Sequence, residues 1–321
     1  MRRLVTYAAP GESAGRLGLL VGEDVVDVAV ASGGALPASL RAMVAVERWE
    51  ERLTALVGPA AGAAPGVAAA PGVGADAAPA VAPGAGVRLL AALPDPVSVR
   101  DFYAFERHVR DARANRGLPM VPEWYEIPVF YFSNALAVRG PDEPVGPPPG
   151  SRQLDFELEV GAVIGRPGRD IAVEAAWEHV AGLVVLNDWS ARDLQVREMK
   201  VGLGPSKGKD FALGIGPWLV PLADLRDRID GERCELAMTA RRNGEVVTTG
   251  NLADLHHSIP RMVAHASAGV DLRPGELLGT GTVGGGCLFE RGPEGPFLQP
   301  GDVVELEVER LGTLRNPIAP F

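Results

Sequence analysis

The sequence predicts an α+β protein that is mostly β, in which a small N-terminal α/β domain precedes a larger domain. From Val87 onward, short apolar runs with the two-residue alternation of strands recur between turns rich in Gly and Pro. Convincing helical patterns are few. They do not alternate regularly with the strands, so a mostly β architecture is favoured over a doubly wound sheet.

The composition is that of a folded, acidic protein. Of the 321 residues, 46% are hydrophobic and 22% charged, and the formal net charge is -10. A chain with a pI near 5.1 lacks the clustered Lys and Arg that bind nucleic acids and anionic membranes, so we expect neither partner. Two cysteines, Cys234 and Cys287, cannot form a disulfide framework or a cysteine-type zinc site. With no secretory signal and no run of about 18 apolar residues, the sequence predicts a cytoplasmic protein.

The first predicted domain comprises residues 1–86. It begins with a few short strands and a hairpin near Gly22–Asp24, and a helix capped by Ser39 is expected over Pro37–Val57. The segment Gly58–Gly86 consists almost entirely of Ala, Pro, Gly and Val, which is typical of a linker. The boundary with the second domain, residues 87–321, is placed in this segment.

Five segments of the second domain are expected to be strands. They are LDFELEVGAVIG (154–165), GLVVLND (182–188), PWLVPL (217–222), CELAMTARRNGEVV (234–247) and DVVELEVERLG (302–312). The fourth is broken by a predicted hairpin turn at Asn243-Gly244. Two glycine-rich segments resemble nucleotide loops but fail in detail: GTGTVG (279–284) does not open a helix, and GLGPSKGKD (202–210) lacks the spacing of a P-loop.

The strand LDFELEVG alternates strictly. Successive side chains of a strand point to opposite faces, so Asp155, Glu157 and Glu159 share one face. One interpretation is an antiparallel strand with a solvated face. The other is a site for a divalent cation.

The segment LNDWSARDLQ carries a second group of polar residues. A buried strand ends at Asp188, and Ser190 with the acid three residues later resembles a capping box for a helix over Ala191–Met199. Arg192 and Gln195 are three residues apart and share one helix face. Together these residues would form the wall of a pocket; alternatively, Asp188 belongs to a turn and Arg192 is solvated.

The segment RDFYAFERHVRDARANRG (100–117) has a helical apolar stripe, formed by Phe102, Phe105, Val109 and Ala112. Asp101 and His108 are seven residues apart and nearly aligned beside this stripe. An Asp at that place caps a helix in the simpler interpretation, and the histidine is then a surface residue.

Four carboxylates that converged without a cation would have to raise their pKa values far above normal. A hard divalent ion removes this difficulty for Asp101, Glu157, Glu159 and Asp188. Ligation by oxygen alone selects magnesium, manganese or calcium over zinc.

Six ordered motifs of the second domain resemble the fumarylacetoacetate hydrolase family. They are Asp101–His108, WYEIPVFYFSN, LDFELEVGAVIG, LNDWSARDLQ, GKDFALGIGPWLVP and LRPGELLGTGTVGGG. The resemblance covers nearly everything from Val87 to the C-terminus. It implies a mixed β-sandwich roll, a homodimer and a divalent cation, with Mg2+ expected first and Mn2+ or Ca2+ as alternatives.

The resemblance also implies roles for individual residues. Four carboxylates would bind the metal: Asp101, Glu157, Glu159 and Asp188. His108 would activate water, and Glu290 would orient the imidazole of His108. Three donors would stabilise developing negative charge: Arg192, Gln195 and Lys209, with Lys207 as a competitor for the last role. Four residues would contact the substrate: Tyr103, Arg116, Tyr131 and Thr282.

The implied activity is metal-dependent hydrolysis of a carbon-carbon bond in a 1,3-diketo acid, such as an acylpyruvate or a fumarylacetoacetate-like compound. The same family supports decarboxylation, tautomerisation or isomerisation, and hydration of 2-oxo acids, which share an enolate intermediate. A catalytically silent ligand-binding protein is a third hypothesis.

Overall fold

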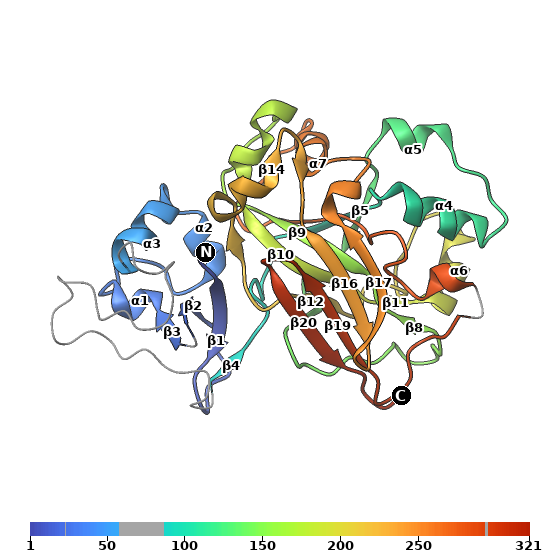
Figure 1. Cartoon of the computed structure of the whole chain (residues 1–321), viewed down its shortest axis with the longest axis horizontal. Helices are drawn as coiled ribbons and strands as arrows, with labels where there is room; N and C mark the ends of the chain where they lie inside the picture. Colours follow the sequence, from blue (N-terminus) through green and yellow to red (C-terminus); the bar gives the residue numbers. More distant parts are fainter. Residues whose placement is uncertain (23, 58–86, 293–294) are drawn as a thin grey trace.

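The computed structural model describes residues 1–22, 24–57, 87–292 and 295–321, so the predicted linker lies outside the described residues. A small N-terminal unit lies at one end of the molecule, and a larger unit made mainly of strands forms the rest (Figure 1). The predicted α+β, mostly β class is confirmed. No helix in the described ranges is long and apolar enough to cross a membrane.

The N-terminal unit is an antiparallel sheet of order β3-β2-β1-β4 with three short helices. Its elements are β1 (Leu4–Ala8), β2 (Arg16–Val21), β3 (Asp24–Asp27), α1 (Val28–Ala31), α2 (Leu40–Val44), α3 (Trp49–Val57) and β4 (Arg88–Leu89). The single helix predicted over Pro37–Val57 is wrong, because the chain between α2 and α3 turns through Arg48 with a φ of 55°. The predicted cap is present: Ser39 Oγ accepts from Ala42 N at 3.3 Å.

The larger unit contains an eight-stranded sheet of order β6-β5-β18-β9-β10-β12-β7, with β13 paired to β10. Its strands are β5 (Val99–Phe102), β6 (Phe130–Ser133), β7 (Val138–Arg139), β9 (Leu158–Ile164), β10 (Val180–Asp188), β12 (Leu213–Ile215), β13 (Val220–Pro221) and β18 (Leu277–Gly279). A four-stranded sheet of order β17-β16-β19-β20 packs against it. Its strands are β16 (Ala237–Arg242), β17 (Glu245–Asn251), β19 (Val303–Val308) and β20 (Gly312–Pro317).

Two short strand pairs and several helices complete this unit. The pairs are β8 (Leu154–Asp155) with β11 (Ser190–Ala191), and β14 (Ile229–Asp230) with β15 (Arg233–Cys234). The α-helices are α4 (Glu106–Ala114), α5 (Pro122–Glu126), α6 (Arg192–Met199) and α7 (Ile259–Ser267). The 3-10 helices are η3 (Val173–His179), η4 (Leu222–Arg228), η5 (Leu252–Asp254) and η6 (Phe289–Arg291).

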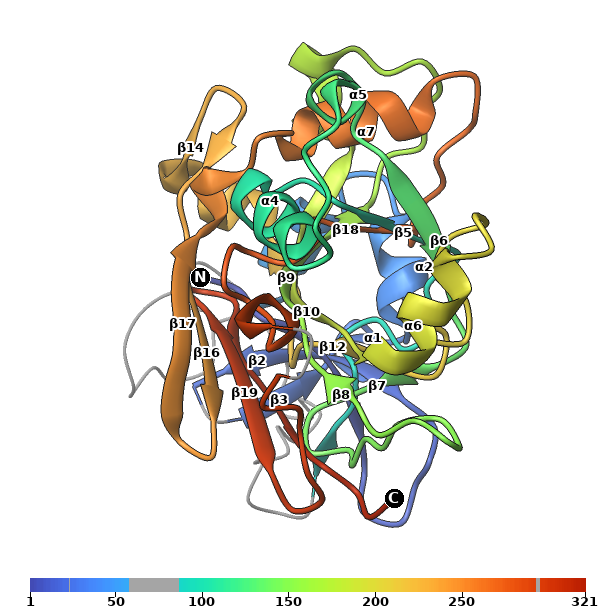
Figure 2. The same ribbon diagram turned by 90° about the vertical axis from the view of Figure 1, so that its right-hand side faces the viewer.

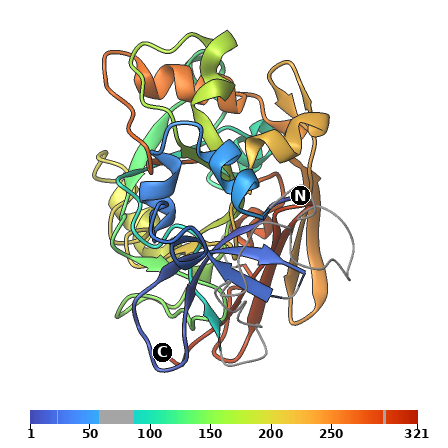
Figure 3. The same ribbon diagram turned by 90° about the vertical axis from the view of Figure 1, so that its left-hand side faces the viewer.

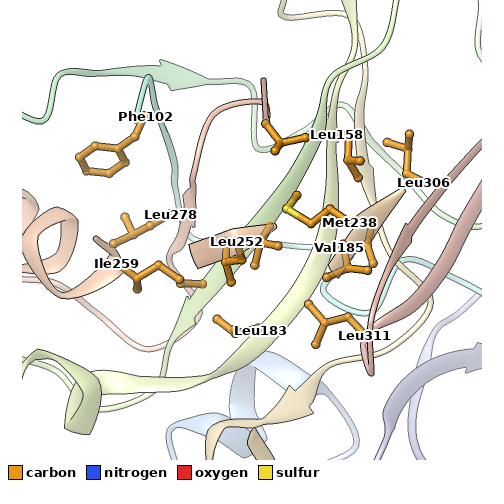
Figure 4. Close-up of a cluster of buried hydrophobic side chains, with 14 of the residues drawn as sticks. Phe102, Leu158, Leu183, Val185, Met238, Leu252, Ile259, Leu278, Leu306 and Leu311 are labelled. Atoms are coloured by element: carbon orange, nitrogen blue, oxygen red, sulfur yellow. The ribbon is translucent and has the colours of Figure 1, made fainter. Parts of the chain in front are cut away.

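Strand β10 is buried on both faces, which explains why its sequence is a continuous apolar run. Leu183 and Val185 face a core shared with Met238 and Leu306 of the four-stranded sheet (Figure 4). The alternate residues, such as Val184, belong to a second core that includes residues of β1, β2 and α2. Seen from the other side, the N-terminal unit covers this second face (Figure 3). The central sheet therefore supplies a frame that is buried on both faces.

Three local predictions are corrected by the structure. The helix expected from Phe102 begins only at Glu106, because Phe102 belongs to β5 and pairs with Phe130. The strand expected over 154–165 is interrupted between β8 and β9, and PWLVPL forms only the two-residue β13. The Asn243-Gly244 turn is confirmed, with positive φ at both residues between β16 and β17.

Candidate active site

Neighbouring strands of the eight-stranded sheet bring four carboxylates together. Asp101 lies on β5, Glu159 on β9 and Asp188 at the end of β10, while Glu157 immediately precedes β9. Strand β18 lies between β5 and β9, and its Gly279 is in register with Asp101. A Cβ at Gly279 would lie 2.4 Å from Asp101 Oδ1, so only glycine leaves room for the cluster. One oxygen from each of the four acids lies within 4.8 Å of the others.

The interpretation of LDFELEVG as a strand with a solvated face is wrong. Asp155 and Glu159 are fully buried and Glu157 is 6% exposed. Because the strand is interrupted after Asp155, this residue leaves the face shared by Glu157 and Glu159 and takes other partners. Of the three acids in the motif, two therefore belong to the cluster.

Burial and mutual repulsion shape the titration of the cluster. Burial, and then the charge of Asp188, raise the pKa of Asp101 well above its usual value. Burial, and then the charge of Asp101, do the same to the pKa of Glu159. Burial alone would raise the pKa of Glu157, but the charges of Lys209 and Arg192 lower it below its usual value.

The cluster has oxygen atoms to spare for a cation. Within the described ranges, Asp101 Oδ1, Glu159 Oε1 and Asp188 Oδ1 are buried and have no hydrogen-bond partner. Buried polar atoms normally have a partner, so these three oxygens are suited to binding a cation. Their all-oxygen chemistry fits a hard divalent cation such as Mg2+, Mn2+ or Ca2+.

A histidine and a glutamate form a buried pair next to the cluster. His108, on α4, places Nδ1 2.6 Å from Oε1 of Glu290, on η6. The other oxygen of Glu290 accepts from Gly285 N at 2.7 Å. Since a carboxylate only accepts hydrogen bonds, this geometry assigns the proton to Nδ1 and leaves Nε2 as an acceptor. The ring of Tyr103 meets the imidazole edge-on, with 5.3 Å between the ring centres. Burial raises the pKa of the Tyr103 hydroxyl to about 12.

Two basic side chains are buried among the carboxylates. Lys209 Nζ contacts Asp188 and lies 2.9 Å from Glu157 Oε2. Arg192 Nη2 donates to Glu157 Oε1 at 2.7 Å, and Nη1 donates to Gln195 Oε1 at 3.0 Å. Lys207, the competitor for the role of Lys209, is exposed and pairs with Asp210 outside the cluster.

A cavity of about 290 Å³ opens onto these groups. Most of the predicted site residues line it: Asp101, Tyr103, His108, Arg116, Tyr131, Glu157, Asp188, Arg192, Gln195, Lys209 and Thr282. Glu159 and Glu290 lie behind this lining. Glu159 accepts a hydrogen bond from Gly281 N, and Glu290 accepts one from His108. Tyr131 donates to Asp188 Oδ2 at 2.7 Å, and burial raises the pKa of Tyr131 well above its usual value. Helices α4 and α6 lie on either side of this part of the molecule (Figure 2), at the end opposite the N-terminal unit (Figure 1).

The capping box predicted at Ser190 is wrong. Ser190 Oγ donates back to Asp188 O at 3.1 Å, and α6 begins at Arg192 after an Ala191 that makes no side-chain cap. The side chain of Arg192 is instead drawn inward by buried acids.

Several lining residues escaped the sequence analysis. They include Arg113, Val196, Met199 and Phe289. Val196 and Met199 follow Arg192 by four and seven residues, so the helical repeat places them on its face and would have found them. No comparable local signal marks Phe289, because only the tertiary fold brings η6 to the cavity.

A mostly β roll with a buried acidic cluster and a neighbouring histidine–glutamate pair is an enzyme-like arrangement. A family profile described as "Fumarylacetoacetate (FAA) hydrolase C-terminal" matches residues 98–319. The chain belongs to the fumarylacetoacetate hydrolase family, which includes hydrolases, isomerases and oxaloacetate tautomerases.

Individual relatives carry different activities in their names. The fumarylacetoacetase of Arabidopsis thaliana is 32% identical over 267 aligned residues, which cover 64% of this chain and 63% of that protein. A mitochondrial oxaloacetate tautomerase of Xenopus laevis is 34% identical over 200 residues, covering 60% and 58%. The crystal structure of a probable 2-hydroxyhepta-2,4-diene-1,7-dioate isomerase from Mycobacterium abscessus superposes with a TM-score of 0.73 at 26% identity, over 100% of this chain and 98% of that chain. The chain thus spans about three fifths of the length of the fumarylacetoacetase and of the oxaloacetate tautomerase.

Proposed function

We propose that this protein is a divalent-cation-dependent hydrolase that cleaves a carbon-carbon bond in a 1,3-diketo acid, such as an acylpyruvate or a fumarylacetoacetate-like compound. The observation that carries this proposal is the buried His108–Glu290 pair, which lies beside the same cavity as the carboxylate cluster. Hydrolysis requires a base that activates water, whereas tautomerisation and decarboxylation of a 2-oxo acid consume no water.

The proposed reaction begins with proton transfer from water to Nε2 of His108. Glu290 holds the Nδ1–H tautomer and stabilises the imidazolium that forms. The water oxygen bonds to the distal carbonyl carbon, and the bond from that carbon to the methylene group breaks. The electron pair of the broken bond is delocalised onto the 2-oxo group, which gives an enolate. The carbon of this enolate then accepts from His108 the proton that came from water. The products are a carboxylic acid and a 2-oxo acid.

The cationic side chains of the cavity stabilise the enolate. Burial alone would lower the pKa of Lys209, but the carboxylates of Asp188 and Glu157 raise it above its usual value, so the ammonium group stays protonated. Arg192 is likewise held charged by Asp155 and Glu157. Fixed charges in a water-poor site need no reorganisation when negative charge develops.

A cation fits the carboxylate cluster described above. Asp101, Glu157, Glu159 and Asp188 would hold it, and we propose Mg2+ first, with Mn2+ or Ca2+ as alternatives. When bound, it would polarise the oxygen atoms of the 2-oxo acid and offset the charge of the cluster.

A 2-oxo acid tautomerase, decarboxylase or hydratase is the second candidate function. It is favoured by the relatives that are named oxaloacetate tautomerases at 34% identity. The test follows the ultraviolet absorbance of a short acylpyruvate with metal-free protein, then with added Mg2+ or Mn2+, while pyruvate and the free acid are assayed. Metal-dependent loss of absorbance with both products supports hydrolysis. Constant absorbance combined with enol-keto exchange or carbon dioxide release from oxaloacetate supports the second candidate, and no turnover of any 2-oxo acid supports a silent ligand-binding protein.

We also propose a homodimer that is formed through the edge strand β6. Phe132 on β6 and Leu136 shortly after it are 64% and 94% exposed, and Leu203, in the segment that follows α6, is 91% exposed. Asn134 Nδ2 donates to Asp210 O at 2.9 Å, which ties the β6 turn to the segment that follows α6. Exposed apolar residues on an unpaired sheet edge are typical of an interface between protomers. The two buried free cysteines support our expectation of a reducing compartment such as the cytoplasm.

A further inference from the structure

Asp155 is fully buried on β8, and both of its carboxylate oxygens are saturated with hydrogen bonds. Oδ1 accepts from Phe156 N at 2.9 Å and from Leu288 N at 2.8 Å. Oδ2 accepts from Arg192 Nε at 2.8 Å and from Phe289 N at 3.0 Å. Four donors thus converge on a side chain that is not among the described residues lining the cavity.

The partners of Asp155 belong to the two halves of the candidate active site. Arg192 reaches from Asp155 to Glu157 of the carboxylate cluster. On the other side, the two backbone amides are those of Leu288 and Phe289, which immediately precede Glu290. A single carboxylate therefore fixes the arginine beside the cluster and the turn that carries the partner of the histidine.

We propose that Asp155 is a positioning residue that holds Arg192 and the turn bearing Glu290 in one fixed arrangement, so that the His108–Glu290 pair forms. A carboxylate suits this place because it offers only acceptors to four fixed donors. An asparagine of the same size would turn its NH2 group either toward Arg192 Nε and Phe289 N or toward Phe156 N and Leu288 N, and two donors cannot satisfy each other. The effect on Glu290 passes along the backbone, since Asp155 does not touch it.

The kinetic part of the test rests on the proposed function. We compare Asp155→Asn with Asp302→Asn, a matched control, in the holoenzyme. Asp302 is also a buried carboxylate and accepts from Gln299 N at 2.7 Å and Arg242 Nη2 at 2.6 Å, but it does not line the cavity. Because misplacing a catalytic group by about 1 Å costs roughly 100-fold, we expect kcat of Asp155→Asn to fall about 100-fold with KM changed less than about threefold. Asp302→Asn should lower Tm with kcat within about threefold of the wild type.

A second measurement does not depend on turnover. In the metal-free protein, the hydrogen bond from His108 Nδ1 to Glu290 should give a downfield imidazole N–H proton resonance, which His108→Gln assigns by removing it. We expect Asp155→Asn to lose or shift this resonance and Asp302→Asn to keep it. If Asp155→Asn fails to fold, Asp155→Glu, which keeps the charge but displaces both oxygens, should show the same loss.

The outcomes separate the two hypotheses. A wild-type resonance that Asp155→Asn leaves unmoved overturns the positioning role, whatever reaction the enzyme performs. So does an equal fall of kcat in Asp155→Asn and Asp302→Asn, which would show general destabilisation. If the wild type hydrolyses no diketo acid but Asp155→Asn loses the resonance, the proposed function fails while the positioning role stands.

Discussion

Replacing Glu290 by glutamine tests the proposed role of His108 as a base most directly. The substitution changes one hydrogen-bond acceptor into a donor without changing the shape of the side chain. The carboxylate accepts from His108 Nδ1 at 2.6 Å and from Gly285 N at 2.7 Å. The backbone donor of Gly285 is fixed, so the single amide oxygen of the variant will turn to it, and the NH2 group will face the imidazole. His108 must then carry its proton on Nε2, where it can no longer accept one from water.

The size of the effect follows from the contacts that are lost. To act as a base, His108 of the variant must return its proton to Nδ1, where it faces the NH2 group. That tautomer lacks a hydrogen bond to a charged group, which contributes about 1.5–3 kcal/mol, and leaves a buried donor unsatisfied, which costs about 1–3 kcal/mol. Both side chains are about 5% exposed, so water cannot replace the lost partner. The two effects together amount to about 2.5–6 kcal/mol, which corresponds to roughly 10²–10⁴-fold slower turnover.

The assay is the initial rate of acylpyruvate cleavage with saturating Mg2+, together with Mg2+ affinity by calorimetry. We expect kcat to fall while KM and metal affinity stay close to wild type. Glu276→Gln is the matched control, because Glu276 is a buried carboxylate that pairs with Arg100 and does not line the cavity. A kcat of Glu290→Gln within about threefold of the wild type would refute the role of this pair.

Three further predictions concern the cation, the base and the assembly. His108→Ala should bind Mg2+ normally and lose hydrolysis, whereas Glu157→Ala should lose both, with metal affinity weakened at least about tenfold in calorimetry; hydrolysis by His108→Ala would contradict the assignment of the base. Because burial raises the pKa of Asp101 and Glu159, the metal-free protein gains stability from their protonated forms below the ordinary carboxyl pKa and loses it as pH rises through the raised values. Added Mg2+ should therefore raise Tm more at about pH 8 than at about pH 5, and at free Mg2+ of 100 times Kd the stabilisation at pH 8 should be about 2.7 kcal/mol; an equal rise of Tm at both pH values in differential scanning calorimetry would count against cation binding at this cluster. Leu136→Lys should shift the sedimentation coefficient from that of a dimer toward that of a monomer, and an unchanged dimer would place the interface elsewhere.

The sequence predicted the fold class and most of the residues around the cavity, because both depend on short-range patterns. Alternation marked the strand of Glu157 and Glu159, and the end of an apolar run marked Asp188. The turn Asn243-Gly244 was also predictable, since both residues need a positive φ. These signals lie within a few residues of the feature they predict.

The errors arose where tertiary contacts decide local structure. The apolar stripe containing Phe102 fits a helix as well as a strand, and only pairing with β6 and β18 selects the strand that carries Asp101. Alternation alone placed Asp155 beside Glu157, although the interruption between β8 and β9 separates them. The role of Asp155 could not be predicted, because its partners Leu288 and Phe289 lie more than 130 residues away in the chain.

Helix α6 lines the cavity with polar side chains in its first turn and with apolar side chains further along. Its first turn presents Arg192 and Gln195 next to the carboxylates, while Val196 and Met199 line the cavity further along the same helix. Mutations at the latter two positions can change the fit of a substrate tail without disturbing the charged groups. Gene duplication followed by drift at these two positions would thus yield proteins that share the charged groups and diverge in the ligands they accept, and the same two positions are the natural targets for directed evolution.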